Sequence, residues 1–402
     1  MIPDSSLKMG FLILFANFAK KITMISRIIH EQMASRIGKG KAILLVGPRQ
    51  VGKSTLLKSL QLEQNQDALL LNCDEPDVRQ MLEDVTSDQL KAIIGKNTLV
   101  MIDEAQKVEH IGLTIKLIVD NLNQVQVIAT GSSAFELRNK ANEPLTGRKF
   151  EFNLLPFSIA EMVNHHGKLT ENRMLERRLI YGLYPEVVNE LGNEQENLLE
   201  LINSYLYKDI LSFQNIRKPD LLDKLLTGLA LQMGQEVSYN ELGQLIGVDK
   251  ATVEKYIDLL EKCFVVFRLS SFNRNLRNEL KKSRKIFFYD NGVRNAILNN
   301  FAPLALRQDA GALWENFMVS ERIKQVAYNR DYRKTYFWRT QTQQEIDLLE
   351  EKNGVLYAYE FKWNDKKQTR IPKSFAEAYP DHRFEVITPA NYIDLLTSTA
   401  VD

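Results

Sequence analysis

A glycine-rich loop between a strand and a helix constrains the fold of this chain more than any other feature. The loop reads Gly47-Pro48-Arg49-Gln50-Val51-Gly52-Lys53-Ser54 and matches the pattern G-x-x-x-x-G-K-[ST] at every fixed position. The apolar run at residues 42–46 is typical of a buried strand, and residues 55–62 are typical of a helix. This order predicts an α/β domain whose backbone N–H groups surround a polyphosphate at a helix N-terminus.

Two segments together supply the groups that a nucleoside triphosphate and its metal need. In the predicted nucleotide-binding set, which runs from Gly47 to Thr55, Lys53 reaches the β- and γ-phosphates and Ser54 ligates Mg²⁺. The apolar strand 99–102 is followed by Asp103 and Glu104, one carboxylate to hold the metal and one to polarise a water. A glycine-rich turn beside an unrelated acidic turn is the alternative, but it does not explain why both halves are present. ATP and Mg²⁺ are therefore the predicted ligands.

The composition is that of a folded protein without a general affinity for nucleic acid. Its 402 residues allow two to four domains, and the net charge of +1 means that any nucleic-acid binding must come from a local patch. Only two cysteines occur, Cys73 and Cys263, without metal-type spacing, as in cytoplasmic proteins with reduced thiols. Residues 1–23 contain an apolar run too short to span a bilayer, so we expect an N-terminal extension outside the fold and no membrane association.

Strands and helices alternate from residue 24 to residue 156, which predicts a parallel sheet with helices on both faces. The segment Thr130-Gly131-Ser132-Ser133 ends its strand at the same sheet edge as the phosphate-binding loop. The hydroxyls of this segment, Ser132 above all, are therefore candidates for sensing the γ-phosphate or positioning the attacking water. A simple Gly-Ser turn is the alternative.

The middle of the chain predicts a helical lid and a winged helix. Residues 157–230 form the lid, and residues 231–290 contain a short helix ending at Gly247 and a second helix capped by Asp249. Two β-rich stretches follow. The loop between them, within 274–285, carries the basic residues Arg274, Arg277, Lys281, Lys282 and Arg284. Such a wing suits contacts with the phosphates of DNA or RNA, but a solvated loop or a protein-docking surface would look the same.

Residues 291–402 predict a further α/β domain with a hairpin of known register. Asn353-Gly354 favours a two-residue type I′ turn, so Lys352 pairs with Val355. Counting outward places Asp347 opposite Glu360 and Glu345 opposite Lys362 on one face. The other face, with Ile346 and Leu348, is mostly apolar, so we expect it to be the face that packs against other elements.

Asp347 and Glu360 together suggest a metal site. Facing carboxylates on paired strands repel at a cost of about 0.2–1 kcal/mol, and a divalent cation would reverse that cost because Mg²⁺ favours carboxylate oxygens. Lys362 shares the face and can steady a nucleophilic water or a scissile phosphate, and Glu315 on the preceding helix can add a ligand. The alternative is a solvated acidic face beside a lysine.

Over residues 24–402 the chain resembles prokaryotic AAA-type (P-loop) ATPases fused to a C-terminal domain of unknown function with a restriction-endonuclease-like core. The matching segments are 47–55, 102–106, 130–133, 146–148, 155–158, 184–186, 207–210, 289–292, 345–347 and 360–362. The resemblance implies that Lys53, Ser54, Asp103 and Glu104 form the nucleotide and Mg²⁺ site. It also implies that Arg148 is an arginine finger or γ-phosphate sensor, and that Asp347, Glu360 and Lys362 match a metal-dependent nuclease.

The sequence thus predicts a Mg²⁺-dependent ATPase that controls a winged-helix and nuclease-like module acting on nucleic acid. A nucleotide-gated binding switch with a silent nuclease-like domain is one alternative, and a nuclease in which ATP only stabilises the fold is another. If Arg148 acts on a neighbouring subunit, the protein is a homo-oligomer.

Overall fold

The computed structural model describes residues 24–64, 68–132, 144–206, 219–273, 283–364 and 369–398. Several sequence predictions fall outside these ranges: the extension at 1–23, Ser133, the segment 207–210 and the loop residues 274–282. Among the residues that are described, no helix is both long and apolar enough to cross a membrane.

The N-terminal sheet is parallel, as the alternation of strands and helices predicted. Its strand order is β2-β3-β4-β1-β5, so that β1, which leads into the phosphate-binding loop, lies inside the sheet. The strands are β1 (Ala42–Val46), β2 (Ala68–Asn72), β3 (Leu99–Asp103), β4 (Gln126–Gly131) and β5 (Lys149–Asn153). Every residue of β1 is buried, as expected for a strand covered on both faces.

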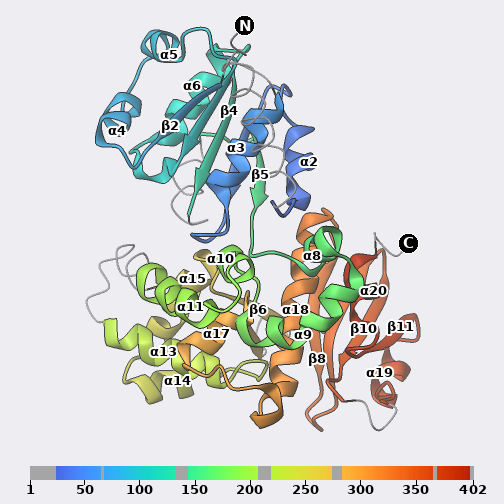
Figure 1. The fold of residues 1–402 in the computed structure, drawn as a ribbon. Coiled ribbons are helices and arrows are strands. Elements are labelled where there is room, and N and C mark those ends of the chain that lie inside the picture. The colour runs from blue at the N-terminus through green and yellow to red at the C-terminus, as the bar shows by residue number, and fades with distance from the viewer. Residues whose placement is uncertain are drawn as a thin grey trace, which may run out of the picture.

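Short helices accompany this sheet (Figure 1). They are α2 (Ile28–Ala34), α3 (Lys53–Gln64), α4 (Pro76–Leu82), α5 (Ser87–Ile94), the 3₁₀ turn η1 (Ala105–Lys107) and α6 (Ile111–Asn121). Thr86 begins α5 with a capping box, because its hydroxyl accepts from the backbone of Gln89 while the Gln89 side chain accepts from the Thr86 backbone.

The described part of the middle of the chain is mainly helical. The helices are α8 (Ile159–His166), α9 (Lys168–Tyr181), α10 (Pro185–Asn189), α11 (Glu194–Leu201), the π-helical turn η2 (Ile202–Leu206), α13 (Pro219–Leu231), α14 (Tyr239–Ile246), α15 (Lys250–Lys262), α17 (Asn291–Ile297) and the 3₁₀ turn η3 (Leu304–Leu306). The predicted helix ends around Gly247 are present: Gly247 adopts the left-handed conformation after α14, and Asp249 accepts from the Thr252 backbone 2.9 Å away to cap α15.

A second, six-stranded sheet joins regions that the sequence analysis had separated. Its order is β11-β10-β9-β8-β6-β7, in which β6 (Val266–Ser271) and β7 (Arg284–Phe288) form an antiparallel pair and β6 lies parallel to β8. The other strands are β8 (Lys334–Arg339), β9 (Glu345–Lys352), β10 (Val355–Phe361) and β11 (His382–Ile387). The predicted domain boundary after residue 290 therefore falls between strands of one sheet. A two-stranded pair such as β6 and β7 is only marginally stable alone, and pairing of β6 with β8 adds it to a larger sheet.

The predicted hairpin register is correct from Lys352–Val355 to Leu348–Tyr359. Its predicted faces are partly wrong, because β9 bulges between its pairings of Ile346 with Trp338 and of Leu349 with Tyr336. Ile346 consequently packs with Leu349 in a small cluster, while Leu348 belongs to the main core. A bulge of this kind redirects the side chains next to it, here Glu345 and Asp347.

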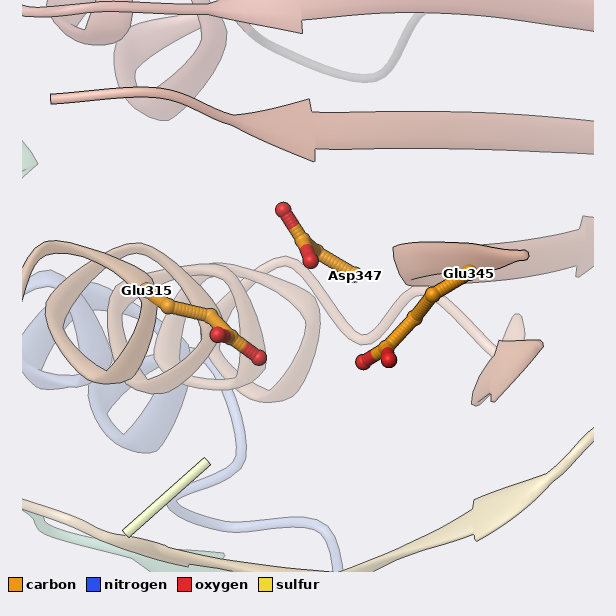
Figure 2. A group of neighbouring side chains, drawn as sticks. All are labelled: Glu315, Glu345 and Asp347. Atoms are coloured by element: carbon orange, nitrogen blue, oxygen red, sulfur yellow. The ribbon is translucent and has the colours of Figure 1, made fainter. Parts of the chain in front are cut away.

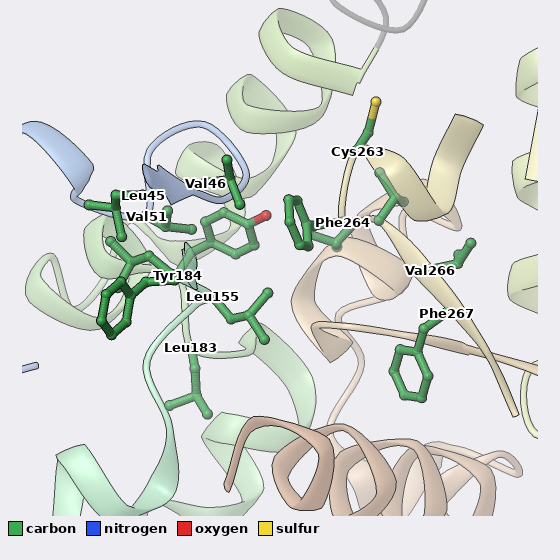
Figure 3. Packing of buried hydrophobic residues seen from close by; sticks show 14 of the residues in the cluster. Leu45, Val46, Val51, Leu155, Leu183, Tyr184, Cys263, Phe264, Val266 and Phe267 are labelled. Atoms are coloured by element: carbon green, nitrogen blue, oxygen red, sulfur yellow. The ribbon is translucent and has the colours of Figure 1, made fainter. Parts of the chain in front are cut away.

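The long helix α18 (Ala310–Tyr328) runs beside the second sheet, and its C-terminal end approaches the N-terminal domain (Figure 1). The short helices α19 (Lys373–Ala378) and α20 (Tyr392–Thr397) complete the fold. One apolar cluster connects the parts: Val46 and Val51 at the phosphate-binding loop continue through Leu155 and Tyr184 toward Phe264 (Figure 3). The phosphate-binding loop thus packs against residues of the helical region and of the segment that leads into β6.

Candidate nucleotide site and carboxylate cluster

The phosphate-binding loop has a backbone that only its glycines permit. Strand β1 ends at Val46 and α3 begins at Lys53. A Cβ on Gly47 would lie 2.0 Å from the carbonyl oxygen of Leu154, and Gly52 has a φ of +91°. These two positions explain the glycines of the motif, since a side chain at either would displace or strain the loop.

Lys53 and Ser54 lie at the start of α3 and face the loop and the neighbouring strand. The buried ammonium of Lys53 donates to the carbonyl oxygens of Gly47 at 3.0 Å and Pro48 at 2.8 Å. The Ser54 hydroxyl donates to Oδ2 of Asp103 at 2.6 Å, while the Thr130 hydroxyl donates to Oδ1. Asp103 at the end of β3 is thereby held between α3 and β4. The structure brings together the predicted metal ligands Ser54 and Asp103.

Glu104 belongs to a second hydrogen-bonded set at the same sheet edge. It adopts the left-handed conformation, with φ 52° and ψ 38°, where β3 ends. Its carboxylate accepts from Nε2 of Gln106 at 2.6 Å, and the same amide donates to the Ser132 hydroxyl at 2.9 Å. Non-glycine residues in this conformation concentrate at functional sites. Sequence reasoning assigned no role to Gln106, although it stands in one of the segments that carried the resemblance.

Arg148 lies away from the phosphate-binding loop of its own chain. Its backbone carbonyl accepts from Ala42, the first residue of β1, whereas the loop follows the last residue of that strand. Its guanidinium donates to Asp120 at 2.7 Å. The parallel pairing of β5 with β1 therefore places Arg148 beside the first residue of β1, at the other end of the strand from the phosphate-binding loop. Its role as an arginine finger toward a neighbouring subunit stays a prediction.

A cavity of about 250 Å³ adjoins the phosphate-binding loop. Gly52, Thr55 and Ser59 line it from the loop and α3. Apolar and polar residues from other elements complete its wall, among them Ile25, His30, Glu63, Phe157, Pro185 and Asn189. The cavity therefore extends from the phosphate-binding loop toward α2 and α10.

A group of carboxylates lies at a second place in the molecule. Glu315 on α18 and Glu345 and Asp347 on β9 each carry an oxygen within 4.8 Å of the others (Figure 2). Burial and the nearby Asp347 carboxylate raise the pKa of Glu315 to about 8. Lys285 on β7 donates to Glu315 at 2.8 Å and forms an ion pair with Glu345.

The predicted partner residues Glu360 and Lys362 lie on the other side of Asp347. The Lys362 ammonium is 2.5 Å from Glu360 and 3.6 Å from Asp347, and Asp347 also accepts from the backbone of Phe361 at 2.8 Å. Burial and the Asp347 carboxylate raise the pKa of Glu360 to about 7. Asp347, Glu360, Lys362 and Glu315 are thus brought together as predicted.

Two features of this cluster differ from the sequence-based expectation. Glu345, which was expected opposite Lys362, instead pairs with Lys285 and lies 3.5 Å from the Arg339 guanidinium. Sequence reasoning missed Lys285 itself, because nothing local to it signals that β7 will share a sheet with β9.

Comparisons with known proteins agree with the predicted class of the N-terminal domain. Residues 39–163 match the AAA domain family. This part of the chain has the fold of an AAA-type P-loop ATPase, as the resemblance implied. Residues 172–304 match a domain of unknown function (DUF8612), and residues 310–394 match another (DUF4143), which is the C-terminal domain of unknown function that the resemblance had named.

Relatives and solved structures extend the similarity beyond the N-terminal domain. An uncharacterized protein of Mycobacterium tuberculosis is 27% identical over 372 residues, which cover 90% of this chain and 80% of the relative. An uncharacterized protein of Methanocaldococcus jannaschii is 28% identical over 330 residues, covering 70% and 67%. A Walker-type ATPase of Pyrococcus abyssi has a similar structure, with a TM-score of 0.46 and 17% identity over 68% of this chain and 96% of that one.

Proposed function

We propose that the chain is a Mg²⁺-dependent ATPase that uses the state of its phosphate-binding loop to rearrange a C-terminal module acting on nucleic acid. Lys53 would exchange the two carbonyl oxygens that it now contacts for phosphate oxygens, while Ser54 and Asp103 would hold Mg²⁺. A bound Mg²⁺ would neutralise charge on the β- and γ-phosphates. Glu104 would accept the proton of the attacking water, with Gln106 and Ser132 fixing its carboxylate.

The cavity beside the loop suits the base and sugar of the nucleotide. Ile25 and Phe157 contribute apolar surface, and His30, Ser59 and Asn189 contribute polar groups. Because the cavity is lined both by α3 and by residues of the helical region, a bound nucleotide would contact both.

The observation that carries the coupling is the position of Arg27. This buried guanidinium donates to the carbonyl oxygen of Val51 in the phosphate-binding loop at 2.9 Å, to Glu161 at 3.0 Å and to the Tyr328 hydroxyl at 3.2 Å. Val51 belongs to the nucleotide site, Glu161 to α8, and Tyr328 is the last residue of α18. A change in the conformation of the loop would therefore be transmitted through Arg27 to α18, the helix that carries Glu315.

A second contact attaches α18 to the segment that follows the N-terminal sheet. Glu321 accepts from the backbone of Ile159 at 2.7 Å, and Lys324 donates to the carbonyl oxygen of Phe157 at 3.0 Å. Glu321 and Lys324 also pair with each other at 2.6 Å. With two buried attachments, α18 would move with that segment as a rigid element.

Hydrogen exchange with and without ATP tests the coupling. In the Glu104→Gln protein, which is expected to hold ATP without hydrolysing it, we expect ATP to change exchange in α18 and in β8 to β10. Tyr328→Phe, which removes only the hydroxyl, should weaken that change at α18, whereas Tyr332→Phe at a 93% exposed position should not. Equal ATP responses in the two phenylalanine variants would refute the proposed route.

Nucleic-acid binding is tested separately. Fluorescence polarisation with DNA and RNA at several salt concentrations should show binding that weakens as salt rises. Lys281→Gln with Lys282→Gln should reduce both the affinity and the salt dependence, while Lys224→Gln at an exposed position on α13 should leave them unchanged. Salt-independent binding, or none, would contradict this part of the proposal.

A nucleotide-gated binding switch with a silent nuclease-like domain is the second candidate, and the ion pairs of Lys285 within the carboxylate cluster favour it. Incubation with DNA or RNA and Mn²⁺, beside an Asp347→Ala control, separates the two. Cleavage that Asp347→Ala abolishes supports the nuclease, and identical traces support the switch. Cleavage that persists in Lys53→Ala supports a nuclease that needs ATP only for stability.

A further inference from the structure

The carboxylate cluster already contains a cation that belongs to the chain. The Lys285 ammonium reaches Glu315 at 2.8 Å and forms an ion pair with Glu345, and both are members of the cluster in Figure 2. Its side chain is only 2% exposed. The third member, Asp347, has its own lysine, Lys362, at 3.6 Å. Each of the three acidic side chains therefore has a lysine ammonium nearby, from Lys285 on β7 or from Lys362, which directly follows β10.

Such an arrangement is stable only while the lysine stays in place. Removing one partner of a buried ion pair leaves an uncompensated charge and typically costs 3–5 kcal/mol. A divalent cation bound by Glu315, Glu345 and Asp347 would compensate the same negative charge, because carboxylate oxygens are its preferred ligands. The Lys285 ammonium and a divalent cation would occupy the same position between the same carboxylate oxygens. The two therefore cannot bind there at the same time.

The backbone around Lys285 ties it to the helix-turn-helix of α14 and α15. Glu236 forms a β-bridge with Lys285, and Val237 donates to the carbonyl oxygen of Arg284 at 2.9 Å. Gly234 lies against Glu315, since a Cβ on that glycine would be 3.3 Å from the Glu315 carboxylate. The segment that covers the cluster is thus the one that leads into α14 at Tyr239.

We infer that Lys285 is the resident cation of this cluster and an internal competitor of divalent metals. Mg²⁺ or Mn²⁺ binds Glu315, Glu345 and Asp347 only when β7 withdraws Lys285, so the cluster is closed to metal in the arrangement described here. The inference concerns the C-terminal module alone and holds whether or not the N-terminal site hydrolyses ATP.

Mn²⁺ binding to the full chain without nucleotide tests this inference. Free Mn²⁺ is measured by electron paramagnetic resonance, and the binding that depends on the cluster is the difference between a protein and its Asp347→Asn counterpart. In the wild type we expect no such difference at millimolar Mn²⁺. Lys285→Met, which keeps the length of the side chain and removes its charge, should gain one Asp347-dependent site at least about tenfold tighter than any in the wild type.

The matched control is Lys334→Met, because Lys334 is an exposed lysine on β8 of the same sheet. It should behave like the wild type. A wild-type protein with an Asp347-dependent Mn²⁺ site whose affinity Lys285→Met does not change would overturn the inference.

A measurement on the wild type keeps the inference testable if Lys285→Met does not fold. Amine-reactive labelling followed by mass spectrometry should modify Lys334 and leave Lys285 unmodified, both without Mn²⁺ and at millimolar Mn²⁺. Labelling of Lys285 in the absence of metal would contradict its burial. Labelling that appears with Mn²⁺, and that Asp347→Asn prevents, would show that metal enters the cluster freely and displaces the lysine.

Discussion

The two sites use similar side chains but hold their lysines in different ways. At the nucleotide site, Lys53 contacts two backbone carbonyl oxygens of the phosphate-binding loop. At the carboxylate cluster, Lys285 contacts the acidic side chains of Glu315 and Glu345. Both lysines donate charge-assisted hydrogen bonds, but only Lys285 also forms a buried ion pair, and removing one partner of such a pair typically costs about 3–5 kcal/mol. Lys53 therefore depends on the conformation of one loop, whereas Lys285 depends on the side chains of another helix and another strand.

The sites also differ in how far apart their residues lie in the sequence. Lys53 and Ser54 are neighbours, and Asp103 joins them from β3 in the same sheet. The cluster instead combines α18, β7 and β9. Local changes should therefore disturb the first site most, and changes in charge balance should disturb the second.

The largest effect is expected from Gly47→Ala at the nucleotide site. The new Cβ would lie 2.0 Å from the Leu154 carbonyl oxygen, so β1 and the chain after β5 must separate. We expect a loss of about 4 kcal/mol or more in unfolding free energy, measured by urea denaturation, together with loss of ATP binding.

Gly311→Ala is the control for that substitution, because among the described residues no atom lies within 4 Å of its new Cβ. In a helix it should stabilise the protein by about 0.5–1 kcal/mol. Equal stabilities for the two variants would show that the loop is not as tightly packed as described.

Glu104→Gln should lower ATP turnover by about 10²- to 10⁴-fold, the range for loss of a general base. The amide keeps the shape of the side chain, so ATP affinity should change little. Phosphate release and ATP binding are measured together, with Glu109→Gln, an exposed residue nearby, as the matched control. Unchanged phosphate release would show that Glu104 is not the general base. The nucleotide site would then lack the catalytic role that distinguishes it from the carboxylate cluster.

The carboxylate cluster should make stability depend on pH. Glu315 has a pKa of about 8 in the folded protein against 4.5 without its surroundings. Between these values the folded state retains a proton that the unfolded state releases, so the unfolding free energy falls as the pH rises through this window, by at most about 1.4 kcal/mol per pH unit. Below pH 4.5 the group is protonated in both states and contributes no pH dependence.

Glu315→Gln should flatten this decline, as measured by calorimetry across the same window. Glu196→Gln, an exposed residue on α11, should retain the wild-type profile. Parallel profiles for wild type and Glu315→Gln would mean that the cluster is less buried than its contacts indicate.

The features that the sequence could predict are those that depend on residues close together in the chain. The phosphate-binding loop, Asp103 and Glu104 were predictable because the motif and the strand end are local signals. The Lys352–Val355 pairing was predictable because Asn353 and Gly354 both take the positive φ that a type I′ turn requires. In each case a few neighbouring residues determine the geometry.

The rest depended on pairing between distant strands. The bulge at Ile346 and Leu349 arises from the pairing of β9 with β8, and the position of Arg148 arises from the pairing of β5 with β1. Lys285 reaches Glu345 because β6 continues into the second sheet through β8. No periodicity or turn signal in these segments specifies their partners.

The smallest effect is expected from Ser132→Ala. The Ser132 hydroxyl accepts from Gln106, and Gln106 in turn holds the Glu104 carboxylate at 2.6 Å. Loss of one such bond is worth about 1 kcal/mol, which corresponds to a roughly fivefold fall in turnover with little change in ATP affinity. Ser35→Ala, which removes an exposed hydroxyl bonded to the Gln32 carbonyl at the end of α2, should leave turnover unchanged. A fall as large as that of Glu104→Gln would instead mean that Ser132 contacts the reacting groups directly, and that the nucleotide site depends as strongly on β4 as on β3.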